Sequence, residues 1–297
     1  MSAPIGFIGL GAMGLPMARN ILRAGIAVRG FDVATAAVAA FTAAGGIAAA
    51  TPAVVADGAS VLVVMVATAD QTEAVLFGSD GAVTALAPGA TIVLHSTVAP
   101  AYATDLGQRL DAHGHRLLDA PVSGGAVGAE SGKLTIMASG SPAAFEAAEP
   151  LLAAIAGKVY RLGDVPGIGS TVKLVNQHLA GVHIAAAAEA MALGTRAGAD
   201  PATLFEVISN SAGNSWMFTN RVPHMLARDF TPLSAVEIFV KDLGIVLDTG
   251  RSLRFPLPVA AAAHQQFLGA AAAGHGREDD SAVVKVYETL AGIKVKG

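Results

Sequence analysis

One lysine stands alone in a long apolar stretch of the chain. Between Asp164 and Glu189, Lys173 is the only Lys, Arg, Asp or Glu, and Asn176 and Gln177 follow it by three and four residues. Positions i, i+3 and i+4 share one face of a helix, so a helix would point these three side chains the same way. Burial favours the neutral amine, which can accept a proton. The pattern fits an acid-base site, although a helical lysine more commonly extends its ammonium into solvent.

A glycine-rich motif near the N-terminus can hold a phosphate. GFIGLGAMG places G-x-G-x-x-G at Gly9, Gly11 and Gly14, after an apolar run and before a helical pattern. In dinucleotide-binding proteins these three glycines make a tight turn, admit the pyrophosphate to the backbone and allow close helix packing. We expect the whole loop to bind the cofactor, including Leu10 and Met13.

An acidic residue indicates which dinucleotide binds. Asp32 ends the second expected strand, 23 residues after Gly9, where a carboxylate can accept hydrogen bonds from the adenosine ribose. The same charge repels a 2′-phosphate, so we expect NAD rather than NADP. Arg29 is the nearby cation, but it lies inside the strand instead of just after it.

The segment DAPVSGG, residues 119–125, follows another apolar run. Ser123 and the backbone N–H groups of Gly124 and Gly125 can form a nest for a substrate carboxylate. The alternative is a polar exit from a strand with no ligand, and Asp119 can be purely structural.

The segment HSTVAP, residues 95–100, puts Ser96 and Thr97 at the carboxyl end of a strand, the edge where α/β sheets bind ligands. These residues can also simply begin the next helix. The eight histidines are scattered without metal-ligand spacing, so we expect no metal site.

The elements that must position these residues alternate between strands and helices. The expected strands are 4–10, 28–31, 61–66, 91–96, 115–120 and 158–163, and the expected helices between them are 13–24, 34–43, 70–77, 100–111 and 142–155. This alternation predicts an α/β, Rossmann-type domain over residues 1–163. The rest, 164–297, is helical in period, which predicts an all-α C-terminal domain that includes a long interdomain helix at about 168–196.

Composition excludes several classes of function. The 297 residues carry a net charge of −4 without a basic run, so we expect no nucleic-acid partner. Mean hydropathy is +0.55, but the uncharged stretch 33–56 is rich in alanine and broken by glycine and proline. We therefore expect two helices and a turn there, and no membrane insertion. The N-terminus lacks a secretory pattern and the chain lacks cysteine, which is consistent with the cytoplasm.

Four segments in order resemble the β-hydroxyacid dehydrogenase family, which includes 3-hydroxyisobutyrate dehydrogenases and tartronate semialdehyde reductases. They are GFIGLGAMGLPMARNI, DAPVSGG, GIGSTVKLVNQ and KDLGIVLD. The resemblance implies a catalytic role for Lys173 and an all-α domain that forms a homodimer or homotetramer. It further implies substrate contacts at Ser123, Gly124, Gly125 and Asn176 or Gln177, and positions near the nicotinamide for Met65, Thr97 and Lys241.

Within the family, stretches such as NSAGNSWMFTNR most resemble the L-threonate dehydrogenases. This implies oxidation of the C2 hydroxyl of L-threonate to 2-oxo-tetronate, with Asn214 and Trp216 facing the reacting cleft. From its type alone, the single Trp is expected in a core or a pocket wall. The alternatives are a 3-hydroxyisobutyrate dehydrogenase, a tartronate- or succinic-type semialdehyde reductase, an imine reductase and a catalytically dead dinucleotide-binding scaffold. An intact lysine disfavours the last two.

Overall fold

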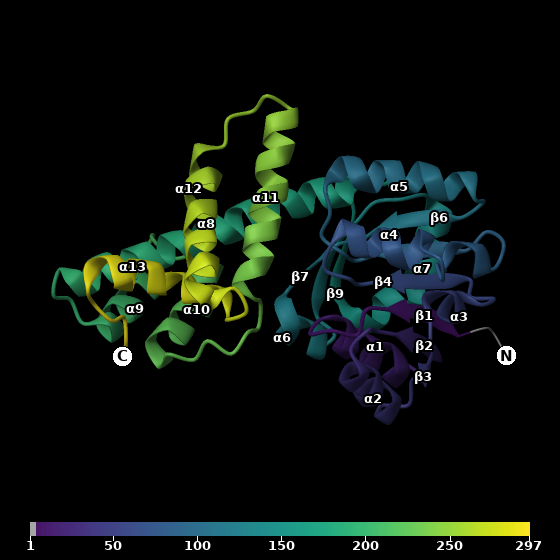
Figure 1. The fold of residues 1–297 in the computed structure, drawn as a ribbon, viewed down its shortest axis with the longest axis horizontal. Helices are drawn as coiled ribbons and strands as arrows, with labels where there is room; N and C mark the ends of the chain where they lie inside the picture. The colour runs from purple at the N-terminus through teal and green to yellow at the C-terminus, as the bar shows by residue number, and fades with distance from the viewer. Residues whose placement is uncertain (1–3) are drawn as a thin grey trace. The chain divides into compact units, whose positions relative to one another are not determined.

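The computed structural model describes residues 4–297, which divide after Lys173 into two compact units. The strands of the first unit are β1 (Ile5–Ile8), β2 (Val28–Phe31), β3 (Ile47–Ala48), β4 (Val61–Val64), β5 (Thr91–Leu94), β6 (Arg116–Asp119), β7 (Val122–Ser123), β8 (Leu134–Ala138) and β9 (Ala156–Arg161). Its helices are α1 (Gly14–Arg23), α2 (Thr35–Ala43), α3 (Pro52–Ala56), α4 (Ala69–Phe77), α5 (Pro100–Ala112), α6 (Gly125–Glu130), α7 (Pro142–Ile155) and a 3-10 turn, Val83–Ala85. Figure 1 shows their arrangement.

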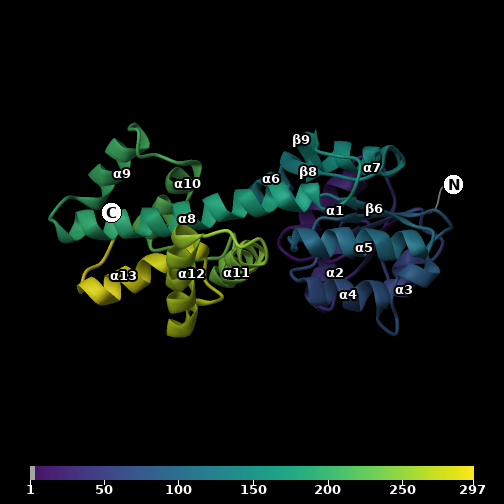
Figure 2. The ribbon, with the colours of Figure 1, turned by 90° about the horizontal axis from the view of Figure 1, so that it is seen from above.

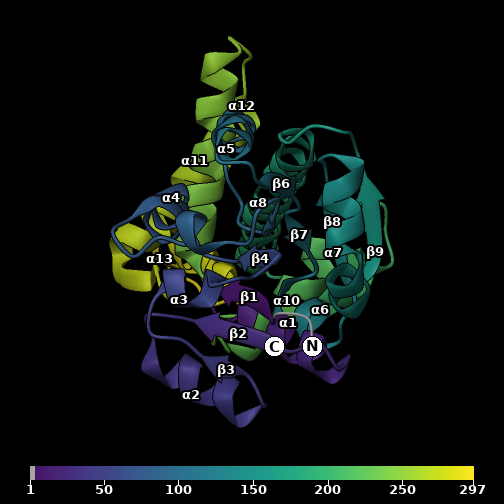
Figure 3. The same ribbon diagram turned by 90° about the vertical axis from the view of Figure 1, so that its right-hand side faces the viewer.

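Six strands form one parallel sheet in the order β3-β2-β1-β4-β5-β6. Successive residues of each strand enter different cores. Phe7 packs with α1 and α7, whereas Ile8 packs with α3, α4 and α5. Figure 3 shows the sheet between α7 and this second set of helices. The expected Rossmann-type fold is confirmed, and the chain reverses its direction of winding between β1 and β4, where such sheets bind their ligands.

A second, three-stranded sheet was not expected. β8 pairs with β7 in antiparallel and with β9 in parallel orientation. The last expected strand of the unit, 158–163, corresponds to β9, but it joins this smaller sheet instead of the main one. Residues 33–56 form α2 and α3 with the two-residue strand β3 between them. Over residues 4–297 no helix combines the length and apolarity that crossing a bilayer requires.

The second unit is all-α, as expected. The boundary between the units falls within α8 (Ile168–Arg196), which Figure 2 shows as one continuous helix. The helices that follow are α9 (Pro201–Ser209), α10 (Trp216–Ala227), α11 (Val236–Ser252), α12 (Pro258–Ala270) and α13 (Val284–Ala291), with a π-helical turn at Ala271–His275 and a 3-10 turn at Asp280–Val283. The Asp200 carboxylate caps α9 by accepting a hydrogen bond from Thr203 N at 2.8 Å. One apolar core joins α8 to α10, α11 and α12.

Candidate functional site

The glycine-rich loop links β1 to α1, and its three glycines meet different surroundings. Gly9 has a φ of +96°, and a Cβ there would lie 2.2 Å from the Met65 carbonyl oxygen. A Cβ on Gly14 would lie 1.8 Å from the Gly9 carbonyl oxygen. A Cβ on Gly11 would meet nothing within 4 Å. Packing therefore requires glycine at the first and third positions, whereas Gly11 leaves the backbone open to a ligand.

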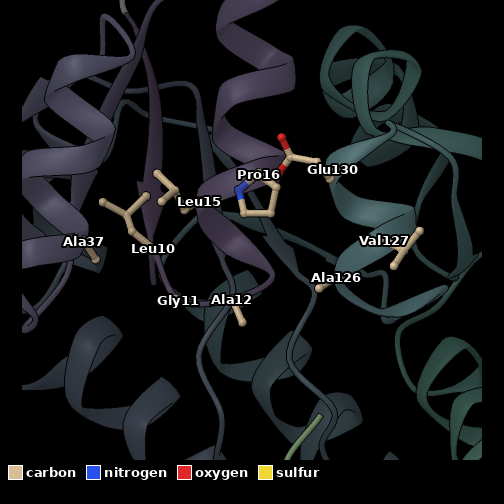
Figure 4. Close-up of a pocket in the computed structure, with 9 residues that line it drawn as sticks. All are labelled: Leu10, Gly11, Ala12, Leu15, Pro16, Ala37, Ala126, Val127 and Glu130. Carbon is tan, nitrogen blue, oxygen red and sulfur yellow. The ribbon is translucent and has the colours of Figure 1, made fainter. Parts of the chain in front are cut away.

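A cavity of about 530 Å³ adjoins this loop and the N-terminus of α1. Its lining comes from the loop, α1, α2 and α6, as Figure 4 shows: Leu10, Gly11, Ala12, Leu15, Pro16, Ala37, Ala126, Val127 and Glu130. Met13 is the residue that precedes α1 and is half-buried. The exposed N–H groups and positive dipole end of α1 favour an anion. The open position at Gly11 and the neighbouring cavity thus fit the pyrophosphate of a dinucleotide.

The Asp32 carboxylate is fixed at the end of β2. One oxygen accepts a hydrogen bond from Leu10 N at 2.6 Å, and the other accepts one from Ala34 N at 2.8 Å. The Arg29 guanidinium donates to carbonyl oxygens of α3 and its C-terminal neighbour at 2.9 and 3.0 Å. These two hydrogen bonds hold the Arg29 guanidinium at α3, while Asp32 is anchored against the glycine-rich loop.

The packing role of Gly14 and the proposed cofactor-binding role of Gly11 can be separated by mutation. Gly14→Ala should lower the free energy of unfolding by about 1–3 kcal/mol because its methyl group overlaps the Gly9 carbonyl. Gly11→Ala should fold normally, because the methyl group enters open space, but should raise the Kd for NADH by about tenfold, or ~1.4 kcal/mol. Thermal unfolding and fluorescence titration measure the two effects. Equal Kd values for Gly11→Ala and the unmodified protein would show that the pyrophosphate lies elsewhere.

The loops after β4, β5 and β6 are tied together at the same sheet edge. Ser96 Oγ accepts a hydrogen bond from Val66 N at 3.0 Å, and Thr97 follows in the same loop. The His95 ring bonds the Ala120 carbonyl oxygen through Nδ1 at 2.5 Å, and burial lowers the pKa of His95 to about 4. His95 is therefore a neutral structural link. In the described chain, 4–297, no three His, Asp or Glu side chains are grouped as metal ligands would be.

Two consecutive glycines with positive φ form the turn after β7. Gly124 and Gly125 have φ values of +126° and +60°, and α6 begins at Gly125. Residues with side chains rarely adopt such angles, so glycine is suited to both positions. The half-buried Ser123 ends β7 beside them. These three consecutive residues form the turn between β7 and α6.

The Asp119 carboxylate holds the start of α8. It is fully buried and accepts hydrogen bonds from Gly167 N at 2.9 Å, Ser170 N at 2.8 Å and Ser170 Oγ at 2.7 Å, with Ser139 Oγ at 3.4 Å. Burial raises the pKa of Asp119, while these hydrogen bonds oppose the rise. The first residue of DAPVSGG is thus a helix cap that sequence reasoning left as a structural possibility.

Lys173 lies three residues beyond Ser170 on α8, and its side chain is only 6% exposed. It is therefore not the solvent-extended lysine that helices usually carry. Asn176 and Gln177 follow on the same helix face, the first half-buried and the second buried.

In the second unit, a polar chain joins α8 to α11. Asn176 Nδ2 donates to Gln177 Oε1 at 3.0 Å, and Gln177 Nε2 donates to Asp242 Oδ2 at 2.6 Å. The other oxygen of Asp242 pairs with Lys241 Nζ at 2.7 Å. Asp242 is buried and was missed from the sequence, although its place directly after Lys241 was a signal.

The segment before α10 differs from one expectation. The Trp216 side chain is 64% exposed, which excludes the core, so the expected place in a pocket wall stays a prediction. Asn214 donates to the Ser209 carbonyl oxygen at 2.9 Å and accepts from Thr219 Oγ1 at 2.8 Å. Asn214 therefore shapes the loop that presents Trp216.

Two family models together match most of the chain. Residues 4–163 match the family described as the NAD binding domain of 6-phosphogluconate dehydrogenase. Residues 167–287 match the family described as NAD-binding of NADP-dependent 3-hydroxyisobutyrate dehydrogenase.

Three full-length relatives are informative. An L-threonate dehydrogenase of Cupriavidus necator is 57% identical, covering 100% of this chain and 99% of the relative. A 2-(hydroxymethyl)glutarate dehydrogenase of Eubacterium barkeri is 41% identical, covering 100% of this chain and 98% of the relative. The crystal structure of a 3-hydroxyisobutyrate dehydrogenase from Salmonella typhimurium has a TM-score of 0.89 and 50% identity, covering 95% of this chain and 99% of that one.

Proposed function

The chain belongs to the β-hydroxyacid dehydrogenase family, and from that premise we propose that it oxidises the C2 hydroxyl of L-threonate to 2-oxo-tetronate with NAD as the hydride acceptor. As a member of the family it is a dehydrogenase with a nicotinamide-dinucleotide domain. The observation that carries the proposal is the buried Lys173 in an intact family motif. The alternative substrates are 3-hydroxyisobutyrate and tartronate- or succinic-type semialdehydes.

The chemistry assigned to the chain is proton transfer and orientation. Bound NAD supplies the hydride acceptor. Ser123 and the N–H groups of Gly124 and Gly125 hold the substrate carboxylate, which fixes the position of C2. Neutral Lys173 accepts the hydroxyl proton as the hydride leaves C2, and the resulting ammonium returns that proton in the reverse direction.

Five further residues orient the reacting groups in this proposal. Asn176, the more exposed of the two amides, contacts the substrate oxygen, and Gln177 orients it through the chain to Asp242. Met65, Thr97 and Lys241 approach the nicotinamide side.

The preference for NAD is assigned to Asp32. Asp32→Ala should lower kcat/KM with NAD by about ten- to a hundredfold, because hydrogen bonds to a charged group contribute ~1.5–3 kcal/mol. It should also bring the values for NAD and NADP closer together. Asp32→Asn is the matched control: it keeps an acceptor for Leu10 N but removes the charge, so it should relax discrimination against NADP with a smaller loss for NAD. An unchanged NAD to NADP ratio in both variants would remove Asp32 from this role.

A panel of hydroxy acids tests the substrate. The initial rate of NADH formation should give the highest kcat/KM with L-threonate among L-threonate, D-threonate, 3-hydroxyisobutyrate and glycerate. A higher value with 3-hydroxyisobutyrate would assign the alternative activity. No turnover with any of them or with the semialdehydes in reverse, together with normal NADH binding, would support a dead scaffold.

The proposal extends to the organisation of the protein. We assign residues 1–163 to the cofactor domain and 164–297 to the helical domain, and we expect a cytoplasmic homodimer or homotetramer. Light scattering of the full chain measures the oligomeric state.

A further inference from the structure

We propose that Asp119 is a positioning residue, whose buried carboxylate fixes the first turn of α8 and thereby sets Lys173 relative to the carboxylate nest at Ser123–Gly125. This inference rests on the proton-transfer role proposed for Lys173. It adds a residue that touches neither substrate nor cofactor but determines where the proton acceptor lies.

The start of α8 is held by side chains from two strands of the first unit. Asp119, at the end of β6, accepts from Gly167 N, Ser170 N and Ser170 Oγ at 2.7–2.9 Å. Ser139, just after β8, accepts from Gly169 N through its Oγ at 2.9 Å. Three N–H groups at the helix start, which have no intrahelical partners, are therefore bound by buried oxygen atoms. This turn is fixed by several directed contacts rather than by apolar packing alone.

The fit at the helix start is also close in space. A Cβ on Gly169 would lie 2.6 Å from the Asp119 carbonyl oxygen and 2.5 Å from the Met137 carbonyl oxygen. Asp119 and Ser139 in turn exchange backbone hydrogen bonds at 3.0 and 2.8 Å. The helix therefore has little freedom to slide or rotate at this end.

Lys173 is close enough to the first turn of α8 that the position of this turn determines the position of the lysine. It lies three residues after Ser170, which corresponds to about 4.5 Å along a helix axis. Because a helix is rigid over one turn, a shift of the capped turn moves the lysine with it. A misplacement of about 1 Å can cost roughly a hundredfold in rate.

The same residue leads directly into the nest. Ala120 N donates to the Leu94 carbonyl oxygen at 2.9 Å, and Met137 N donates to the Pro121 carbonyl oxygen at 3.0 Å. The segment between Asp119 and Ser123 is therefore hydrogen-bonded to residues of both sheets. One carboxylate thus connects the proposed anchor of the substrate to the helix that carries its proton acceptor.

A double-mutant cycle tests whether Asp119 acts through Lys173. Asp119→Asn keeps the side-chain shape but puts an amide group where the carboxylate accepts several hydrogen bonds. It should lower kcat by about ten- to a hundredfold, with KM for the hydroxy acid and Kd for NADH changing much less. In the Lys173→Met background the same substitution should not lower the residual kcat further, because the group it positions is absent.

Asp279→Asn is the matched control. Asp279 is another fully buried carboxylate that accepts from a backbone N–H and a serine hydroxyl at a helical start, through Ser281 at 3.1 and 2.6 Å, but it lies in the second unit. The Asp279→Asn variant should have a lower Tm than the unmodified protein, with kcat near the unmodified value. If Asp119→Asn fails to fold, Ser170→Ala removes a single Asp119 contact and should give a smaller loss of kcat that also vanishes without Lys173.

The outcomes separate this inference from the proposed function. Loss of activity in Lys173→Met with a normal kcat in Asp119→Asn would overturn the positioning role alone. Equal losses from Asp119→Asn in both backgrounds would make Asp119 a general structural residue and overturn it as well. Normal turnover of Lys173→Met would overturn the proton-transfer role and, with it, this inference.

Discussion

Lys173→Met will lower kcat by about 10²–10⁴-fold, the range for a lost general acid-base, while NADH binds as before. Methionine keeps a long unbranched chain in the buried position but offers no amine to accept the hydroxyl proton. Initial rates in both reaction directions and a fluorescence titration with NADH measure the two quantities. Lys158→Met is the control, since Lys158 is an exposed residue of β9 in the same unit and should retain full activity.

The pH dependence adds a second readout to this experiment. A general base gives the rate of oxidation an acidic limb, a fall in rate as the pH drops, because only its unprotonated form accepts the hydroxyl proton. The residual rate of Lys173→Met should lack that limb. Near-normal turnover in the variant would end the assignment of Lys173 as the proton acceptor.

Gly125→Asp will raise KM for the hydroxy acid by about two orders of magnitude. Two like charges about 5 Å apart repel by ~3 kcal/mol at an effective dielectric constant of roughly 20. A Cβ on Gly125 would meet nothing within 4 Å, and its φ of +60° is one that Asp and Asn tolerate better than other side chains. The variant should therefore fold while placing a carboxylate in the nest.

Gly125→Asn provides the neutral comparison for this variant. The two side chains have nearly the same shape, so a difference in KM between them reports charge repulsion rather than steric obstruction. Steady-state kinetics at fixed, saturating NAD should show a much smaller KM change for Gly125→Asn. Equal KM values for the two variants would mean that no substrate carboxylate occupies the turn.

The cofactor half of the molecule could be predicted because its signals are local. The apolar run, the three glycines and Asp32 each depend on neighbouring backbone geometry, and the structure shows the close approach of Gly9 and Gly14 that requires glycine. Strands buried on both faces likewise give continuous apolar runs, such as 61–64. The burial of Lys173 was a hypothesis drawn from its isolation in the sequence, and its low exposure confirms it.

The residues that the sequence left undefined depend on long-range contacts. Asp119 and Ser170 are 51 positions apart, and Gln177 and Asp242 are 65 apart. Neither helical nor strand periodicity connects residues over such distances. For Trp216 the sequence left a core and a pocket wall open. Its exposed side chain excludes the core, and the hydrogen bonds of Asn214 shape the loop before it.

The central claim is that a hydride leaves C2 of L-threonate. L-threonate labelled with deuterium at C2 or at C3 tests it directly, with the NADH recovered after turnover analysed by mass spectrometry. The account predicts deuterium in NADH from the C2-labelled substrate only, with a slower rate than for the unlabelled acid. Deuterium in NADH from the C3-labelled substrate would place the oxidation at the other hydroxyl and contradict the account.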